Sequence, residues 1–366
     1  VRNILIIAYL VGLAIGIHLL NLLAFPFLAL IIYYKKYPFR PVSFLTVIIL
    51  TGIAFGVIYL GIIKGIPNLL DKTGLSMTII IILGIFAATA YFIKSKKTLL
   101  ATLLACLSLV LVGYSTYTTI FIRAVQNPAI NENSPDTIAG AISYLNREQY
   151  GDWDILNRKS TLQRPENTYW KRYTLNRGKP KPKEVRDFIW NYQVKEMYLR
   201  YFAWQFIGKG EMDWPVINKK GTLLRYKEGI NSTRYIIPLA FIIGMIGMVF
   251  HFQQDWRRAL AVLALFVTTG LLIILYLNQY DPQPRERDYS YVGSFFTFSI
   301  WIGIGIAGIA DWISKLVKDA NGSKMATAGL MILLFIMMPV NMLAKDYREH
   351  NRAGNFVAWD YAYNML

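Results

Sequence analysis

Residues 75–93, LSMTIIIILGIFAATAYFI, decide the fold, because this run contains no charged side chain. An uninterrupted apolar stretch of this length can cross the hydrocarbon core of a bilayer as one α-helix. The sequence therefore predicts an all-α polytopic membrane protein. Further runs of spanning length occur near residues 42–63, 99–122, 234–251, 257–277, 293–312 and 325–344.

The first apolar block, residues 3–34, is too long for one upright helix. Gly12, Gly16, His18 and Asn21 interrupt it, so we expect a short helix to about residue 15 and a full span from about 17 to 34. His18 and Asn21 are expected to hydrogen-bond to each other or to a neighbouring helix. With this block the chain has about eight predicted transmembrane helices.

Composition agrees with a membrane protein and narrows its partners. The 366 residues are 55% hydrophobic, with a mean hydropathy of +0.36 and a formal net charge of +17. Many basic residues lie in short loops beside the spans, where anionic lipid headgroups attract them, and no helix-turn-helix, zinc or RNA-binding motif is present. We therefore expect membrane lipids and no nucleic acid as partners. The single cysteine, Cys106, excludes an intrachain disulfide and a cysteine-based metal site.

Basic residues in short loops orient the predicted spans. Counting spans places all four basic loops on one side, which the positive-inside rule predicts to be cytoplasmic. Residues 1–122 and 234–344 are then the membrane regions, whereas residues 123–233 form an outward, periplasmic domain and residues 345–366 begin a second one. The four basic loops lie at residues 35–40, 94–97, 257–258 and 315–324.

The predicted outward domain, residues 123–233, is basic and rich in aromatic residues. Ser134, Pro135 and Asp136 are typical of a helix start, so we expect a helix over about 135–147. Residues 184–207 carry aromatic and basic side chains near helical spacing. This second helix lies either on the membrane surface or with its apolar face buried inside the outward domain.

A charged loop, residues 280–291 with the sequence YDPQPRERDYSY, separates two predicted spans. Pro282 and Pro284 prevent a helix there. Arg285 and Arg287 offer planar forked donors that match phosphate oxygens, so we predict that they bind a phosphate at the membrane edge. Ionisable residues this close to hydrocarbon mark function more often than in a soluble protein.

The acidic residues of the same loop support a second interpretation. Asp281, Glu286 and Asp288 flank the arginines and can neutralise them, in which case the loop only caps two helices. Under the functional hypothesis, Asp281 belongs to the substrate-binding residues together with the two arginines. Both interpretations stay open at the level of the sequence.

Residues 131–133, Asn-Glu-Asn, place several oxygen atoms just outside the span that ends near residue 122. Asn131, Glu132 and Asn133 suit sugar hydroxyls or a hard divalent cation, which is the one cofactor that the sequence suggests. Their spacing matches no EF-hand, and no residue is assigned as a metal ligand. No histidine and cysteine cluster, catalytic triad or phosphate loop can be assembled from the chain.

Several stretches together carry a resemblance to one bacterial family. The most specific is PRERDY (284–289), followed by VGSFF (292–296). The chain resembles the multi-spanning inner-membrane family known as domain of unknown function 2723, which is grouped with the GT-C glycosyltransferases and is similar to protein O-mannosyltransferases. The other stretches are GLAIGIHLLNLL (12–23), INEN (130–133), SYLNREQYGD (143–152) and LRYFAWQF (199–206).

The resemblance implies a GT-C-like helical bundle with a mainly helical outward domain, in the bacterial inner membrane. Such an enzyme transfers a sugar from a polyprenyl-phosphate carrier to a protein or glycan acceptor. GT-C enzymes carry their acidic catalytic residue in the first outward loop, which we expect to precede Val1, so the catalytic residue is unknown and Glu132 and Asp288 are reserve candidates. We expect the chain to be an inactive internal fragment that also lacks a C-terminal soluble domain.

A non-enzymatic role is the alternative, either as a transporter or as a scaffold of envelope assembly or secretion. A transporter would more naturally show inverted repeats and polar spans broken by glycine or proline near the bilayer centre. Apart from the first block, polar residues of this chain concentrate outside the spans. This distribution favours an enzyme that acts at the membrane surface.

Overall fold

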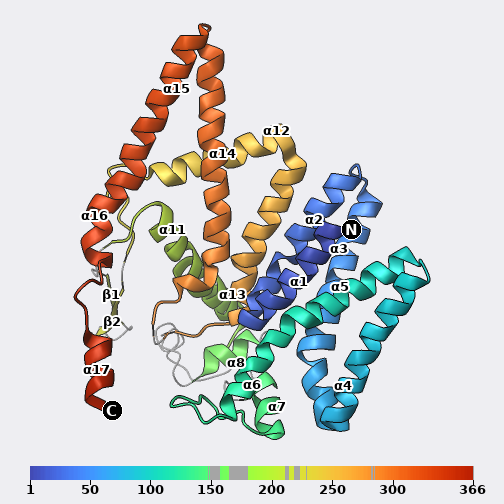
Figure 1. The fold of residues 1–366 in the computed structure, drawn as a ribbon. Coiled ribbons are helices and arrows are strands. Elements are labelled where there is room, and N and C mark those ends of the chain that lie inside the picture. The colour runs from blue at the N-terminus through green and yellow to red at the C-terminus, as the bar shows by residue number, and fades with distance from the viewer. Residues whose placement is uncertain are drawn as a thin grey trace. The chain divides into compact units, whose positions relative to one another are not determined.

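The chain divides into two compact units in the computed structural model (Figure 1). Unit 1 comprises Val1–Arg158 and Leu260–Asn278, and unit 2 comprises Lys159–Ala259 and Gln279–Leu366. The predicted outward domain, 123–233, is therefore shared between both. The structure describes residues 1–146, 148, 157–164, 180–210, 214–217, 223–227, 229–281, 283 and 285–365.

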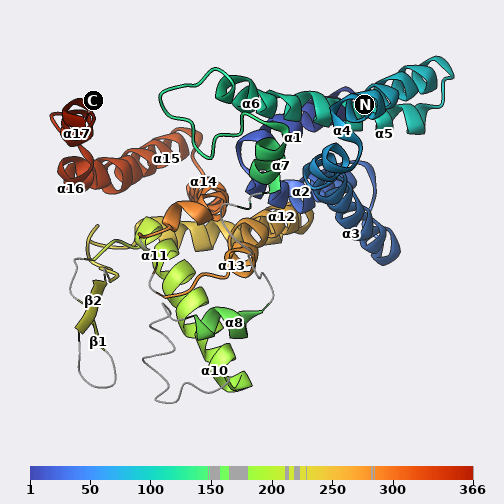
Figure 2. The ribbon, with the colours of Figure 1, turned by 90° about the horizontal axis from the view of Figure 1, so that it is seen from below.

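Unit 1 is built from helices. Helices α4 and α5 form a hairpin, α5 packs along α1, and α2 packs against α3; both views place α1 and α5 side by side (Figures 1 and 2). The basic loops that follow α2 and α4 lie at one end of this bundle, and α6 and α7 lie at the other (Figure 1). The helices are α1 (Arg2–Ile17), α2 (Phe25–Lys36), α3 (Pro41–Gly56), α4 (Gly65–Lys94), α5 (Thr98–Tyr114), α6 (Thr119–Ala124), α7 (Ile138–Asn146) and α13 (Leu271–Leu277), with shorter 3-10 or π turns at Leu19–Ala24, Val57–Ile63 and Ser115–Thr118.

The first apolar block is broken at His18, whose backbone is extended (φ −153°, ψ 123°). Its Nδ1 accepts the Leu20 N–H at 3.2 Å and so caps the helical turn that follows. Asn21 Nδ2 donates to the Ala14 carbonyl at 2.9 Å, which satisfies a helix-end acceptor. The His18 ring and the Asn21 amide therefore each hydrogen-bond to the backbone, one after the break and one before it.

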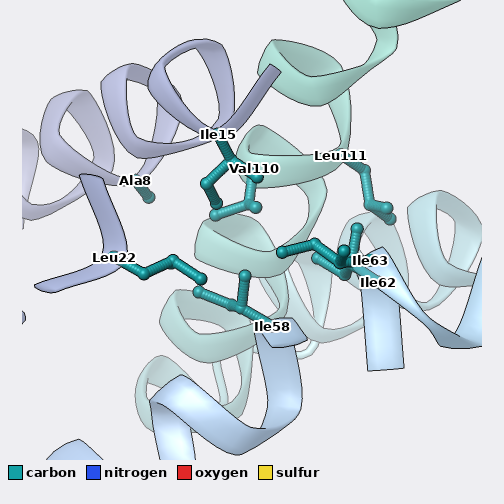
Figure 3. Close-up of a cluster of buried hydrophobic side chains, with 8 residues drawn as sticks. All are labelled: Ala8, Ile15, Leu22, Ile58, Ile62, Ile63, Val110 and Leu111. Atoms are coloured by element: carbon teal, nitrogen blue, oxygen red, sulfur yellow. The ribbon is translucent and has the colours of Figure 1, made fainter. Parts of the chain in front are cut away.

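The core of unit 1 lies where α1 crosses α5. Glycine permits the close approach, because a Cβ on Gly113 would lie 2.5 Å from the Tyr9 carbonyl oxygen and one on Gly12 would overlap the Val110 backbone. Apolar side chains from four segments meet there, as Figure 3 shows. They are Ala8, Ile15, Leu22, Ile58, Ile62, Ile63, Val110 and Leu111.

Six helices in the described part of the chain are long and apolar enough to cross a membrane, which shows an all-α polytopic membrane protein. The sequence predicted about eight. The difference arises because two of the six, Pro41–Lys94 and Leu239–Leu277, each contain two predicted spans. Gly74 (φ 77°, ψ 172°) and Asp255 (φ −149°, ψ 78°) interrupt these long segments. The remaining four are Leu19–Lys36, Thr98–Ala124, Asp288–Leu316 and Ala320–His350.

Unit 2 combines helices with one two-stranded antiparallel sheet. Its strands β1 (Trp214–Ile217) and β2 (Leu223–Lys227) pair with each other. Helices α14 and α15 form an antiparallel pair that leads to α16 (Figure 1). The helices are α8 (Arg158–Gln163), α10 (Pro182–Asp187), α11 (Arg200–Phe206), α14 (Val292–Leu316), α15 (Ala320–Phe335), α16 (Asn341–His350) and α17 (Val357–Met365), and α12 (Leu239–Thr269) belongs to both units.

The helix expected over 184–207 is present and runs from Pro182 to Phe206, through α10, a π-helical stretch (Phe188–Leu199) and α11 (Figure 2). Proline suits its first position, and the Glu184 carboxylate accepts the Lys181 N–H at 2.7 Å. Its apolar face is buried within unit 2: Phe188, Tyr192 and Tyr201 are each 0% exposed. Of the two interpretations, burial inside the domain is therefore the one that the structure supports.

The helix expected over 135–147 begins later than predicted. It is α7, Ile138–Asn146, and residue 147 lies outside the described residues. Thr137 Oγ1 accepts the Gly140 N–H at 3.1 Å, so Thr137 caps the helix. The prediction that Ser134 starts it was wrong, because the Ser134 backbone is left-handed (φ 40°).

Candidate functional site

The charged loop of residues 280–291 is held at its start by the buried helix of unit 2. Tyr192 Oη donates to the Tyr280 carbonyl at 2.8 Å, and Gln193 Nε2 donates to the Gln279 carbonyl at 3.0 Å. Asp281 is 0% exposed, so its carboxylate faces the interior of the unit. Pro282 and Pro284 lie outside the described residues.

Arg200 binds the middle carboxylate of the loop through a fork. Its Nη2 lies 2.9 Å from Glu286 Oε2 and its Nη1 lies 3.3 Å from Oε1. The Arg200 side chain is 6% exposed and the Glu286 side chain 42% exposed. The guanidinium also lies over the Trp204 ring, 4.5 Å from its centroid. A forked, charge-assisted pair of this kind fixes both position and orientation.

Tyr201 connects the same carboxylate to the next residue of the loop. Its hydroxyl contacts Glu286 Oε2 and accepts the Arg287 N–H at 3.2 Å. Burial, and then the hydrogen bond to Glu286, raises the pKa of Tyr201. The phenol therefore keeps its proton for donation to the carboxylate, while its oxygen holds the Arg287 backbone.

Arg285 and Arg287 remain on either side of this clamped glutamate. Arg285 is exposed, with its guanidinium 5.5 Å from the centre of the Tyr289 ring. Arg287 is half-buried. Within the described residues neither arginine forms an ion pair with an acidic side chain, and Arg287 Nε has no hydrogen-bond partner.

The third acidic residue of the loop also does not neutralise the arginines. Asp288 Oδ1 accepts the Tyr289 N–H at 3.0 Å, and its Oδ2 lies 3.5 Å from Gln205 Nε2. The sequence had left open whether the loop neutralises itself. In the described structure Glu286 pairs instead with Arg200, 86 positions earlier in the chain, so within the described residues Arg285 and Arg287 are left without an ion pair to a carboxylate of their own loop.

The second set of predicted site residues, Asn131–Asn133, belongs to unit 1, whereas the charged loop belongs to unit 2. Asn131 Nδ2 donates to the Ala124 carbonyl at 3.3 Å and holds the segment against α6. Convergence of the two sets on one substrate stays a prediction. No group of three or more His, Cys, Asp or Glu side chains lies together in the described ranges, and the divalent cation stays a prediction as well.

Sequence reasoning missed the residues that organise the loop. LRYFAWQF (199–206) contains Arg200 and Tyr201, and it contributed to the family resemblance without an assigned role. Its partner in the loop is separated from it by more than eighty positions. An arginine and a tyrosine on the buried face of an amphipathic helix were the available signal, because such polar groups need buried partners.

Comparison with known proteins gives one result for the start of the chain. The family described as Protein O-mannosyl-transferase TMEM260 N-terminal domain matches residues 1–40. These residues form α1, the break at His18 and α2. No curated protein and no solved structure matches the chain. Together with the candidate membrane helices, the match indicates at this coarse level a membrane protein with a glycosyltransferase-related segment at residues 1–40.

Proposed function

We propose that the protein is a GT-C-type membrane glycosyltransferase of the family known as domain of unknown function 2723. It transfers a sugar from a polyprenyl-phosphate carrier to a protein or glycan on the periplasmic face of the bacterial inner membrane. The observation that carries this proposal is that the Glu286 carboxylate binds Arg200 and Tyr201 and does not pair with the adjacent arginines within the described residues. Arg285 and Arg287 are thereby left to bind an anion.

The position of the two arginines suits a lipid-linked phosphate. They directly precede the candidate membrane helix Asp288–Leu316. A polyprenyl chain keeps its tail in the hydrocarbon and its phosphate at the edge, so a forked donor at the end of a membrane helix can reach that phosphate. The match of residues 1–40 to an O-mannosyl-transferase domain supports the same reaction class.

The reaction is a single displacement at the anomeric carbon. The acceptor hydroxyl oxygen forms the new bond, the bond from the anomeric carbon to the phosphate oxygen breaks, and a carboxylate takes the hydroxyl proton. Arg285 and Arg287 stabilise the departing phosphate. Glu132 and Asp288 are the reserve candidates for the carboxylate, and Asp288 is already engaged by the Tyr289 N–H.

The first prediction tests phosphate binding without requiring transfer. In lipid nanodiscs, Arg285→Ala/Arg287→Ala should weaken polyprenyl-phosphate binding at least about tenfold, because each charge-assisted hydrogen bond contributes about 1.5–3 kcal/mol. Arg257→Ala/Arg258→Ala removes the same charge at the predicted cytoplasmic side and should bind nearly as the unmodified protein does. Equal binding by both double variants would refute the assignment of the loop.

The alternative of a transporter or scaffold makes a different prediction for the full-length protein in the same lipid nanodiscs. It gives no sugar transfer from polyprenyl-phosphate mannose, and it gives stable protein partners on purification. The absence of an ion pair to Arg285 or Arg287 within the described residues and the match of residues 1–40 to an O-mannosyl-transferase domain favour the enzyme. Transfer that is lost in Arg285→Ala/Arg287→Ala but retained in Arg257→Ala/Arg258→Ala would decide in its favour.

A further inference from the structure

A cleft of about 280 Å³ lies between the end of α6, the segment after it and α7, entirely within unit 1. Arg123, Asn131, Glu132 and Tyr144 line it. Small-molecule sites begin at roughly 300 Å³, so the cleft has room for one ring and not for an extended chain. The charged loop of unit 2 contributes nothing to its lining.

One wall of the cleft is aromatic and fixed in orientation. The Tyr144 ring lies 6.1 Å from the Phe121 ring, edge to face, and 6.3 Å from the Tyr117 ring. Both contacts lie in the range in which aromatic rings attract each other. An aromatic face held in this way can support the apolar C–H face of a sugar ring, while the hydroxyl groups at the edge of the ring stay available.

The other wall carries both signs of charge. Arg123 and Glu132 are exposed and form no ion pair in the parts of the chain that the structure describes. A phosphate would meet the Glu132 carboxylate, and a metal ion would meet the Arg123 guanidinium. A neutral polyol suits both, since each hydroxyl group donates to a carboxylate and accepts from a guanidinium.

Asn131 completes this polar edge. Its amide nitrogen is fixed by the Ala124 carbonyl, so the side chain is positioned before a ligand binds. The segment around it contains non-glycine residues with left-handed backbone: Asn127 (φ 49°), Asn133 (φ 60°) and Ser134 (φ 40°). Such conformations are uncommon away from turns and functional sites.

We propose that this cleft binds one neutral pyranose ring, with Tyr144 beneath the ring and Arg123, Asn131 and Glu132 at its hydroxyl edge. The inference rests on the proposed function, because the ring would be a sugar of the glycan acceptor. Glu132 is then a contact of the ring hydroxyls.

The test is binding of methyl α-mannopyranoside to the chain in nanodiscs, measured by saturation-transfer NMR and calorimetry. Glu132→Ala and Arg123→Met should each weaken binding about tenfold, since a hydrogen bond to a charged group is lost. Asp136→Ala removes an exposed acid of the same segment that does not line the cleft, and it should leave binding unchanged. These exposed positions tolerate substitution without unfolding.

Three results would overturn the inference: no saturable binding, equal binding by all variants, or displacement of the sugar by inorganic phosphate or calcium. Failure here is distinct from failure of the transferase proposal. One outcome is that glycoside binding depends on Glu132 while Arg285→Ala/Arg287→Ala leaves polyprenyl-phosphate binding intact. That outcome refutes the phosphate site and supports the sugar cleft. The opposite outcome is that the arginine double variant loses polyprenyl-phosphate binding while no variant changes glycoside binding, and it refutes only the sugar cleft.

Discussion

Two Arg-Tyr dipeptides in unit 2 perform the same local task with different results. In Arg200–Tyr201 and in Arg234–Tyr235 the arginine binds a carboxylate and the tyrosine hydroxyl contacts the same group, Glu286 in the first case and Asp346 in the second. Arg234 Nη2 lies 2.7 Å from Asp346 Oδ1, and Tyr235 Oη lies 2.6 Å from Oδ2. Each clamp joins segments that are far apart in the sequence.

The charge around the two clamps differs. Arg234 also binds Glu349 at 2.8 Å, so one arginine meets two carboxylates of α16. At the first clamp one carboxylate lies between two further arginines, Arg285 and Arg287. The second clamp therefore attaches a helix, whereas beside the first clamp Arg285 and Arg287 form no ion pair within the described residues and can bind a ligand. The same dipeptide therefore holds a helix in one place and a loop with two arginines in the other.

The largest effect is expected from Arg200→Leu. It removes the partner of Glu286, whose carboxylate can then pair with Arg285 or Arg287, so polyprenyl-phosphate binding should fall about tenfold or more. Unfolding should require about 3 kcal/mol less, the lower end for a broken buried pair, because Glu286 is partly exposed. Binding in nanodiscs and thermal unfolding measure the two effects.

The double variant Arg200→Leu/Glu286→Gln separates charge from folding. It lacks the freed carboxylate, so phosphate binding should recover towards that of the unmodified protein although the clamp is absent. Binding as weak as in Arg200→Leu would mean that the clamp acts only by shaping the loop.

A smaller and purely structural effect is expected from Arg234→Leu. Asp346 and Glu349 lose their shared cation, so the free energy that holds α16 in place should fall by about 2 kcal/mol. The loss is moderate because the side chains are only partly buried. Trypsin cleavage after Lys345 and Arg348 reports this detachment. Polyprenyl-phosphate binding by the folded protein should not change, and a loss comparable to that of Arg200→Leu would make the two clamps equivalent.

The sequence predicts the membrane class because the signal is local. The apolar run at 75–93 and its counterparts identify spanning helices without knowledge of their neighbours. The eight predicted spans and the six long helical segments describe the same stretches, because a kink at Gly74 and another at Asp255 each divide one long segment into two helices. The start of α7 was misplaced because Thr137, and not the better-looking Ser134, accepts from the first turn.

The candidate site was predictable only in part, for the same reason. Arg285 and Arg287 are conspicuous in the sequence because they lie close to apolar spans. Whether Glu286 pairs with these arginines depends on Arg200 and Tyr201, and the contacts of Glu286 with these two residues join positions 86 and 85 apart. No periodicity or spacing rule covers that separation. The cleft beside Asn131 likewise requires Tyr144 from a different helix.

The smallest effect distinguishes the two tyrosines. Tyr235→Phe deletes a hydroxyl bound to a half-buried carboxylate and should lower stability by about 1 kcal/mol near pH 8. Burial, and then the hydrogen bond to Asp346, raises the pKa of Tyr235 to about 12. An unfolded tyrosine ionises near pH 10, so this stabilisation is complete below about pH 10 and is lost as the pH rises through about 12. The unfolding temperatures of the unmodified protein and Tyr235→Phe should therefore converge in that interval.

A difference in unfolding temperature that stays constant with pH would assign the effect of Tyr235→Phe to ring packing. Phosphate binding near pH 8 should be lost only in Tyr201→Phe, so its loss in Tyr235→Phe would abolish the distinction between the clamps.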